Sequence, residues 1–117
     1  MLQISPQSRI LASIKPIDFR KGIDSLAGAC LNQLDQDPLS GTIFLFRNHE
    51  NNAIKILVYD GQGFWLCVKR LSKGKFTWWP TGSGSTTKVD CRELMTLIWN
   101  GNPSKANFSD DWKKVVI

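Results

Sequence analysis

Short apolar segments, separated by only a few turn-forming residues, fill the middle of the chain and constrain its fold more than any other feature. Four of them cover residues 42–46, 53–59, 64–71 and 75–79, and they are rich in β-branched and aromatic side chains. The turns between them contain Asn, Asp, Gly and Ser. Connections this short join antiparallel neighbours, because a parallel pair needs a crossover of about a dozen residues or more. The pattern therefore predicts a β-meander of four strands.

Helical patterns flank this meander on both sides. Apolar residues recur at three- and four-residue intervals over residues 23–34, which places them on one stripe of a helix, and Asp18 is a candidate cap for its start. Asp90 and Glu93 have the spacing of a capping box at the start of a second helix. A further short strand is expected at residues 9–14. We therefore expect an α+β fold with a four- to five-stranded, mainly antiparallel sheet and two helices packed on one face.

The chain has the length of one ordinary domain, and we expect a single domain over residues 1–117. Residues 81–88 are rich in Gly, Ser and Thr, which predicts a mobile polar loop. Residues 103–117 follow the helix-stop signal at Gly101 and are expected to form a C-terminal tail. No apolar run approaches the roughly 20 residues of a membrane-spanning helix, and the N-terminus lacks a secretory pattern. These features predict a cytoplasmic protein.

The charge and the cysteines narrow the range of partners. Fifteen Lys and Arg against ten Asp and Glu give a net charge of +5 and a pI near 9.3, which favours a polyanion as partner but also fits a soluble protein that is merely basic. Cys30, Cys67 and Cys91 are widely spaced in apolar surroundings, and the single histidine is His49. This pattern favours reduced, buried thiols over a disulfide framework or a zinc site. We therefore expect no metal ion and no cofactor.

No catalytic constellation is recognisable in the sequence. Nucleophilic catalysis needs a nucleophile beside a base, and two-metal chemistry needs several carboxylates around the ions. Neither arrangement is visible. Gly61-Gln62-Gly63 lies in an expected hairpin rather than between a strand and a helix, so it does not indicate a dinucleotide site. We therefore expect a protein that is not an enzyme by itself.

The strongest positive feature is a basic cluster around one expected hairpin. Cations interleaved with aromatic residues on a sheet can follow a phosphate backbone and stack on bases. A second basic pair lies near the start of the first expected helix, where main-chain N–H groups favour anions. The candidate nucleic-acid-binding residues are Lys55, Lys69, Arg70, Lys73, Lys75 and Trp78 from the first group, and Arg20 and Lys21 from the second. The alternatives are that edge lysines only discourage strand aggregation, that the tryptophans belong to the core, and that Arg20 makes a structural salt bridge.

Alternation along the expected strands separates two faces. Residues such as Ile54 and Ile56 form a wholly apolar face, which fits a core covered by helices. The other face mixes aromatic, aliphatic and lysine side chains and is too apolar for a plain solvated surface. Leu57, Tyr59 and Trp65 are therefore candidate partner-binding residues.

Many short motifs recur in an order and at a spacing that resemble one family. They lie at residues 16–26, 37–41, 44–48, 54–64, 69–71, 74–76 and 78–80, and begin with Pro-Ile-Asp-Phe-Arg-Lys-Gly. Over about residues 9–101 they resemble TnpB, the accessory protein encoded by the second open reading frame of bacterial insertion sequences of the IS66 type. The motif positions in this chain are Asp18, Arg20, Lys21, Lys55, Asp60, Gly61, Gly63, Lys69, Arg70, Phe76 and Trp78.

The resemblance implies a role in DNA transposition, with a separate, larger transposase carrying the cutting and joining chemistry, and it supplies no catalytic residues. Two functions stay open. The first is a DNA-binding accessory module with weak sequence preference, held to phosphates by the basic residues. The second is a protein-interaction module of the transposition complex that makes no direct DNA contact and docks on the transposase through the mixed face.

Overall fold

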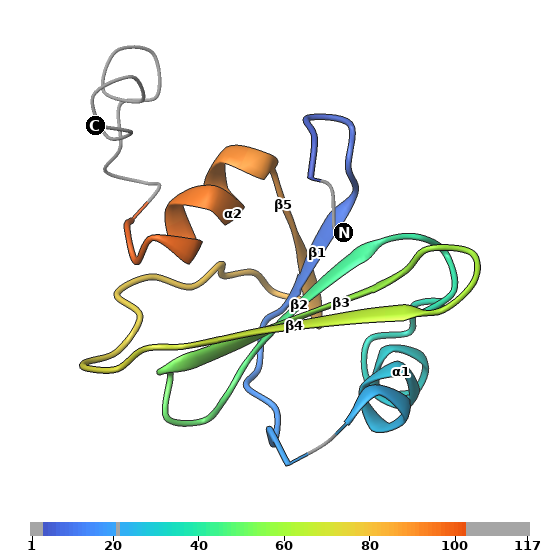
Figure 1. The fold of residues 1–117 in the computed structure, drawn as a ribbon, viewed down its shortest axis with the longest axis horizontal. Helices are drawn as coiled ribbons and strands as arrows, with labels where there is room; N and C mark the ends of the chain where they lie inside the picture. The colour runs from blue at the N-terminus through green and yellow to red at the C-terminus, as the bar shows by residue number, and fades with distance from the viewer. Residues whose placement is uncertain (1–3, 21, 103–117) are drawn as a thin grey trace.

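The computed structural model describes residues 4–20 and 22–102, and the strands of this part of the chain form one five-stranded sheet (Figure 1). In chain order the elements are β1 (Ile10–Ser13), α1 (Ile23–Asn32), β2 (Ile43–Arg47), β3 (Ala53–Tyr59), β4 (Phe64–Arg70), β5 (Thr86–Val89) and α2 (Cys91–Ile98). The strand order is β4-β3-β2-β1-β5. The expected α+β class and mainly antiparallel sheet are confirmed. Lys21 and the expected tail at residues 103–117 lie outside the described residues.

One pair of strands is parallel. β1 lies beside β2 with Ile10 opposite Ile43, and α1 forms part of the connection between them. Such a connection is needed because a tight turn reverses the direction of the chain. From β2 onward two hairpins join β2, β3 and β4 as antiparallel neighbours, as the spacing of the turns predicts.

The fourth strand of the expected meander does not form. Residues 75–79 are irregular, and Phe76 and Trp79 are buried against the sheet. The Trp79 indole N–H donates to the Ser13 carbonyl at 2.8 Å. The prediction of a strand here is wrong. Aromatic residues indicate that a segment is buried, but an irregular segment that crosses over a sheet can be as buried as a strand. The fifth strand is β5, which pairs with β1 and includes residues 86–88 of the expected mobile loop.

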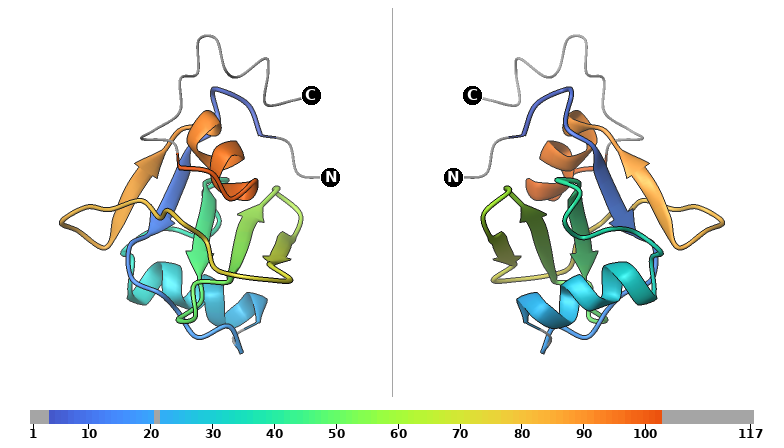
Figure 2. Two further views of the ribbon diagram at one scale, coloured as in Figure 1. Left: turned by 90° about the vertical axis from the view of Figure 1, so that its left-hand side faces the viewer. Right: turned by 90° about the vertical axis from the view of Figure 1, so that its right-hand side faces the viewer.

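The two helices cover opposite faces of the sheet, so the expectation that both pack on one face is also wrong. The core cluster beneath α1 contains Phe44 and Phe46 of β2, whereas the cluster beneath α2 contains Ile43 and Leu45 of the same strand. Successive side chains of a strand point to opposite faces, so a continuous apolar run in a central strand needs cover on both sides. The left view of Figure 2 looks onto the side covered by α2, and the right view onto the side covered by α1.

The two helices begin differently. α2 has the expected capping box, in which the Asp90 carboxylate accepts from the Glu93 main-chain N–H at 2.8 Å and Glu93 accepts from the Asp90 N–H at 3.0 Å. The N-cap of α1 is Gly22, and no side chain caps it. The expectation that Asp18 caps α1 is therefore wrong, and its carboxylate instead binds Arg20.

Candidate nucleic-acid interface

The loop before α1, the β2–β3 turn and the chain leaving β4 meet at one end of the sheet. Main-chain hydrogen bonds tie them together: Ile17 N–H to Arg47 O at 2.9 Å, Leu71 N–H to Asn52 O at 2.8 Å, and Phe76 N–H to Asn51 O at 2.8 Å. They surround an open hollow of about 700 Å³, which we call the basic depression after its two arginines, Arg20 and Arg70. Its lining residues are Asp18, Phe19, Arg20, Asn48, His49, Glu50, Asn52 and Arg70. Arg20 and Arg70, fifty positions apart in the sequence, therefore line one surface feature.

Arg20 is presented to solvent in a fixed position. Its Nη2 lies 2.7 Å from Asp18 Oδ2, and Asp18 Oδ1 also accepts from the Arg20 main-chain N–H at 2.9 Å. The hydrogen bond and charge of Asp18 raise the pKa of Arg20. The Arg20 side chain is 92% exposed, and a pair this exposed adds little to stability. The salt bridge that was the alternative for Arg20 is therefore present, and its main effect is to orient the guanidinium.

Arg70, Lys73 and Lys75 carry the positive charge at the end of β4 and in the turn that follows. All three are exposed, and none forms an ion pair with another residue of the described ranges. The positive φ of Gly74, 75°, makes the turn between the two lysines. The turn that carries both lysines is anchored at residues 71 and 76, whose main-chain N–H groups are bonded to Asn52 and Asn51 of the β2–β3 turn.

Lys55 and Lys69 belong to the folded framework instead. Lys55 is only 9% exposed, donates to the Phe19 carbonyl at 2.9 Å and lies 4.8 Å from the centre of the Phe19 ring. Lys69 donates to the Ile98 carbonyl at the end of α2, a position that favours a cation, and lies 5.5 Å from the Trp99 ring. Both were expected to contact phosphate. The structure instead uses Lys55 to fasten the loop that carries Arg20.

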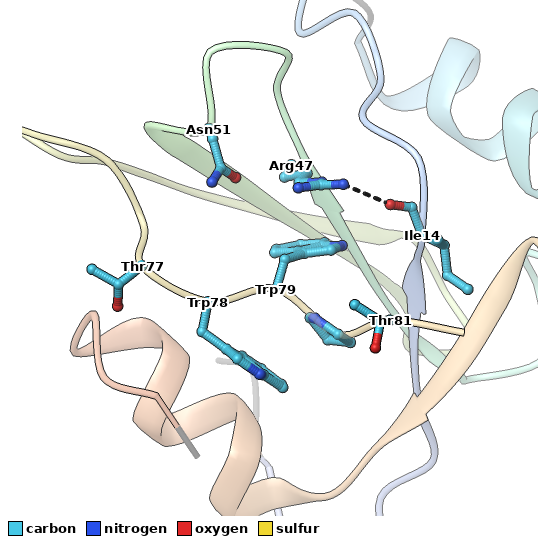
Figure 3. Close-up of a pocket in the computed structure, with 8 residues that line it drawn as sticks. Ile14, Arg47, Asn51, Thr77, Trp78, Trp79 and Thr81 are labelled. Carbon is cyan, nitrogen blue, oxygen red and sulfur yellow. Dashed lines mark hydrogen bonds between the residues drawn. The ribbon is translucent and has the colours of Figure 1, made fainter. Parts of the chain in front are cut away.

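Trp78 does not reach the basic depression. It is half-buried at the edge of the core beneath α2 and lines a smaller hollow with Arg47 and Asn51, on the other side of the β2–β3 turn (Figure 3). The sequence reasoning missed Arg47, Asn51 and Glu50. Arg47 could have been found from its place at the end of an apolar run, where a strand leads into a turn.

The three candidate partner-binding residues do not form one surface. Leu57 is fully buried beneath α1, and Tyr59 is half-buried with its ring 5.1 Å from that of Phe64. Trp65 pairs with Val58 and therefore lies on the opposite face of the sheet. It is 42% exposed, and its indole N–H donates to Asp60 Oδ2 at 2.9 Å. Of the three, Trp65 alone is a large exposed side chain.

The chemistry of the remaining side chains is limited in the described part of the chain. Among residues 4–20 and 22–102, no group of three His, Cys, Asp or Glu side chains is placed to hold a metal ion. Burial raises the pKa of the Cys30 thiol to about 12, which keeps it in the unreactive thiol form. Neither described helix is long and apolar enough to cross a bilayer.

Comparisons with known proteins agree with the motifs. The sequence model of the family described as "IS66 Orf2 like protein" matches residues 8–106. Two curated proteins of Sinorhizobium fredii are similar: the uncharacterized protein y4hO is 33% identical over 98 residues, 84% of each chain, and the uncharacterized protein y4jC is 35% identical over 77 residues, 66% of each chain. No solved structure matches. The family match spans most of the chain and confirms the resemblance, so this chain belongs to the IS66 Orf2-like family of transposition-associated accessory proteins.

Proposed function

We propose that this chain is a non-catalytic DNA-binding accessory protein of transposition, which acts in the cytoplasm beside a separate transposase. The basic depression and its neighbouring lysines grip the phosphate backbone with little sequence preference. The observation that carries the proposal is that Arg20 and Arg70, distant in sequence, line one hollow. The turn that carries Lys73 and Lys75 is bonded at both of its ends to the β2–β3 turn, which lines the same hollow. Lys21, outside the described residues, remains a proposed contact through its place next to Arg20 in the sequence.

The charges of the site predict weak, salt-sensitive binding. The lining of the depression holds two arginines and two carboxylates, Asp18 and Glu50, so the excess positive charge comes from Lys73 and Lys75. A cation–phosphate contact in bulk water contributes only about 1 kcal/mol at about 4 Å. Four such contacts correspond to a slope of log affinity against log salt of roughly −3 to −4.

Fluorescence anisotropy with a labelled duplex over a range of salt concentrations tests the proposal. Arg70→Ala and Lys73→Ala should each flatten the slope by about 0.9. Lys88→Ala is the matched control, because Lys88 is also exposed but lies on β5 at the opposite edge of the sheet. A wild-type chain that fails to bind duplex at low salt, or equal losses in all three variants, would contradict the proposal.

A second candidate function is protein interaction at the β3–β4 hairpin tip. The specific observation is that Trp65 stays exposed while its indole N–H is held by Asp60. An indole fixed in this way loses little entropy when a partner covers it, as at interface hot spots. Asp60 is the only charged residue between positions 56 and 68, so the tip suits a protein surface better than DNA.

Co-purification with the transposase of the same element tests this second function. Trp65→Ala should abolish the complex and leave DNA binding unchanged. Val68→Ala is the control, since Val68 is 57% exposed on the same strand but on the other face. A complex that survives Trp65→Ala would exclude the tip as the docking surface.

A further inference from the structure

We propose that the hollow on the other side of the β2–β3 turn binds an unpaired nucleobase of the same DNA. This inference rests on the proposed DNA binding and adds to it a preference for DNA with unstacked bases. The hollow, which we call the Trp79 cleft, has a volume of about 250 Å³. Its lining residues are Ile14, Arg47, Asn51, Thr77, Trp78, Trp79, Pro80 and Thr81 (Figure 3).

Arg47 brings a cation into this cleft, and no carboxylate of residues 4–20 or 22–102 forms an ion pair with it. Its guanidinium lies 5.4 Å from the centre of the Trp79 ring, and Nη2 donates to the Ile14 carbonyl at 2.9 Å. Removal from water lowers the pKa of Arg47, which reflects the cost of placing its charge there. No residue that lines the cleft is acidic, so a ligand with electron-rich acceptor atoms would compensate this charge.

Asn51 fixes an amide beside this cation. Its main chain adopts the left-handed conformation with φ of 59°, and its Nδ2 donates to the Phe76 carbonyl at 3.1 Å. In Figure 3 the Asn51 amide points toward the space beside Arg47. The side chain is therefore held in place by its turn and by the segment that crosses it.

Two buried polar atoms of the cleft lack a hydrogen-bond partner. Among the described residues, Arg47 Nε and Asn51 Oδ1 are the buried side-chain atoms of this kind, and both belong to cleft-lining residues. A buried donor or acceptor without a partner is destabilising, so a ligand group that hydrogen-bonds to either atom would be favoured. One water takes about 30 Å³, so the cleft has room for a larger occupant than one bridging water.

The donor of Arg47 and the acceptor of Asn51 line the same cleft as two indoles and a guanidinium, a combination that matches the chemistry of a nucleobase. Base edges carry neighbouring acceptors and donors, and single-stranded bases stack on aromatic rings and on guanidinium planes. An acidic peptide fits less well, because the cleft offers one cation and its other polar groups are neutral. The β2–β3 turn also links the two sites, since Asn51 lines the cleft while Asn52 lines the basic depression.

The test compares three labelled DNAs in anisotropy titrations: a blunt duplex, the same duplex with a short single-stranded overhang, and that overhang with abasic nucleotides. We expect the overhang to bind at least five-fold more tightly than the blunt end, because one base–aromatic contact corresponds to roughly five- to 150-fold in affinity. We expect abasic nucleotides to remove this preference. An equal affinity for blunt and overhanging DNA, or a preference that persists without bases, would overturn the inference.

Two variants assign the preference to the cleft. Asn51→Gly suits the left-handed main chain and removes the amide, and Trp78→Ala removes one indole. Both should lower the overhang preference to less than two-fold and leave blunt-duplex affinity unchanged, whereas the control Trp65→Ala should retain it. A preference unaltered in both variants, or its suppression by a glutamate-rich peptide but not by mononucleotides, would overturn the inference. Blunt-duplex affinity separately tests the proposed function.

Discussion

Replacing Lys55 by methionine separates a structural lysine from a phosphate-binding one. The Lys55 ammonium donates to the Phe19 carbonyl at 2.9 Å and lies 4.8 Å from the Phe19 ring, in a side chain that is 9% exposed. A hydrogen bond to a charged group contributes about 1.5–3 kcal/mol, and a cation–π contact about 0.5–2 kcal/mol. Methionine keeps most of the apolar stem and avoids burying a charge, which offsets part of this loss. We expect Lys55→Met to lower the free energy of unfolding by about 1–2 kcal/mol.

Thermal unfolding followed by circular dichroism measures this change. A loss of about 1–2 kcal/mol corresponds to a fall in Tm of roughly 4–10 °C for a chain of this size. Lys88→Met removes the same charge from an exposed position on β5 and should leave Tm within about 2 °C of the wild type, because surface substitutions change stability by about 0.5 kcal/mol or less. An unchanged Tm for Lys55→Met, together with a salt slope of DNA binding flatter by about 0.9, would refute the structural role and restore the direct phosphate contact.

Four further substitutions test separate parts of the structure. Glu50→Gln removes a carboxylate from the basic depression and should strengthen duplex binding about two- to five-fold at low salt, an increase that disappears at high salt in the same anisotropy assay. Gly28→Ala in α1, where an added Cβ meets no atom within 4 Å, should raise the free energy of unfolding by about 0.5–1 kcal/mol, whereas Gly61→Ala, at φ of 97°, should lower Tm in the same unfolding scan. Hydrogen bonds from Gln62 N–H, Gly63 N–H and the Trp65 indole lower the pKa of Asp60, so its contribution to stability is present above the ordinary carboxyl pKa of about 3.9 and is lost as the pH falls through the lowered value. The Tm of the wild type should therefore exceed that of Asp60→Asn at pH 7, and the difference should close in strongly acidic solution.

The parts of the fold that followed from the sequence are those with clear turn or capping signals at their ends. β3 occupies the residues expected for it because Ala53–Tyr59 lies between two turn signals, and α2 begins where its capping box is. β5 was missed because Thr86–Val89 is a short edge strand with one buried side chain, Val89, and its polar composition indicates a loop. The apolar run in β2 already implied cover on both faces, which is what places the two helices on opposite sides.

The exposed cations of the candidate site were predictable from the sequence, but the residues of the β2–β3 turn and the direction of the strand lysines were not. Lys55 and Lys69 lie on adjacent strands but point to opposite faces, and each meets a main-chain carbonyl of a neighbouring segment. A sequence pattern shows which residues of a strand share a face of the sheet. It does not show which loop or helix end lies over that face. The side chains of Arg70 and Lys73 stay exposed because these residues lie where the strand ends and no described segment covers them.

Asn48 explains how one short turn can support both proposed binding surfaces. Its Oδ1 accepts from the main-chain N–H groups of Asn52 and Ala53 at 3.0 and 3.1 Å, and its Nδ2 donates to Asn52 Oδ1 at 2.6 Å. These hydrogen bonds lie within the turn and fix its main chain, which holds Asn51 on the side of the cleft and Asn52 on the side of the depression. Binding of a phosphate in the depression and of a base in the cleft would then need no rearrangement of the turn between them. A preformed site avoids the entropy of ordering its loops, so each proposed contact would contribute more of its energy to binding.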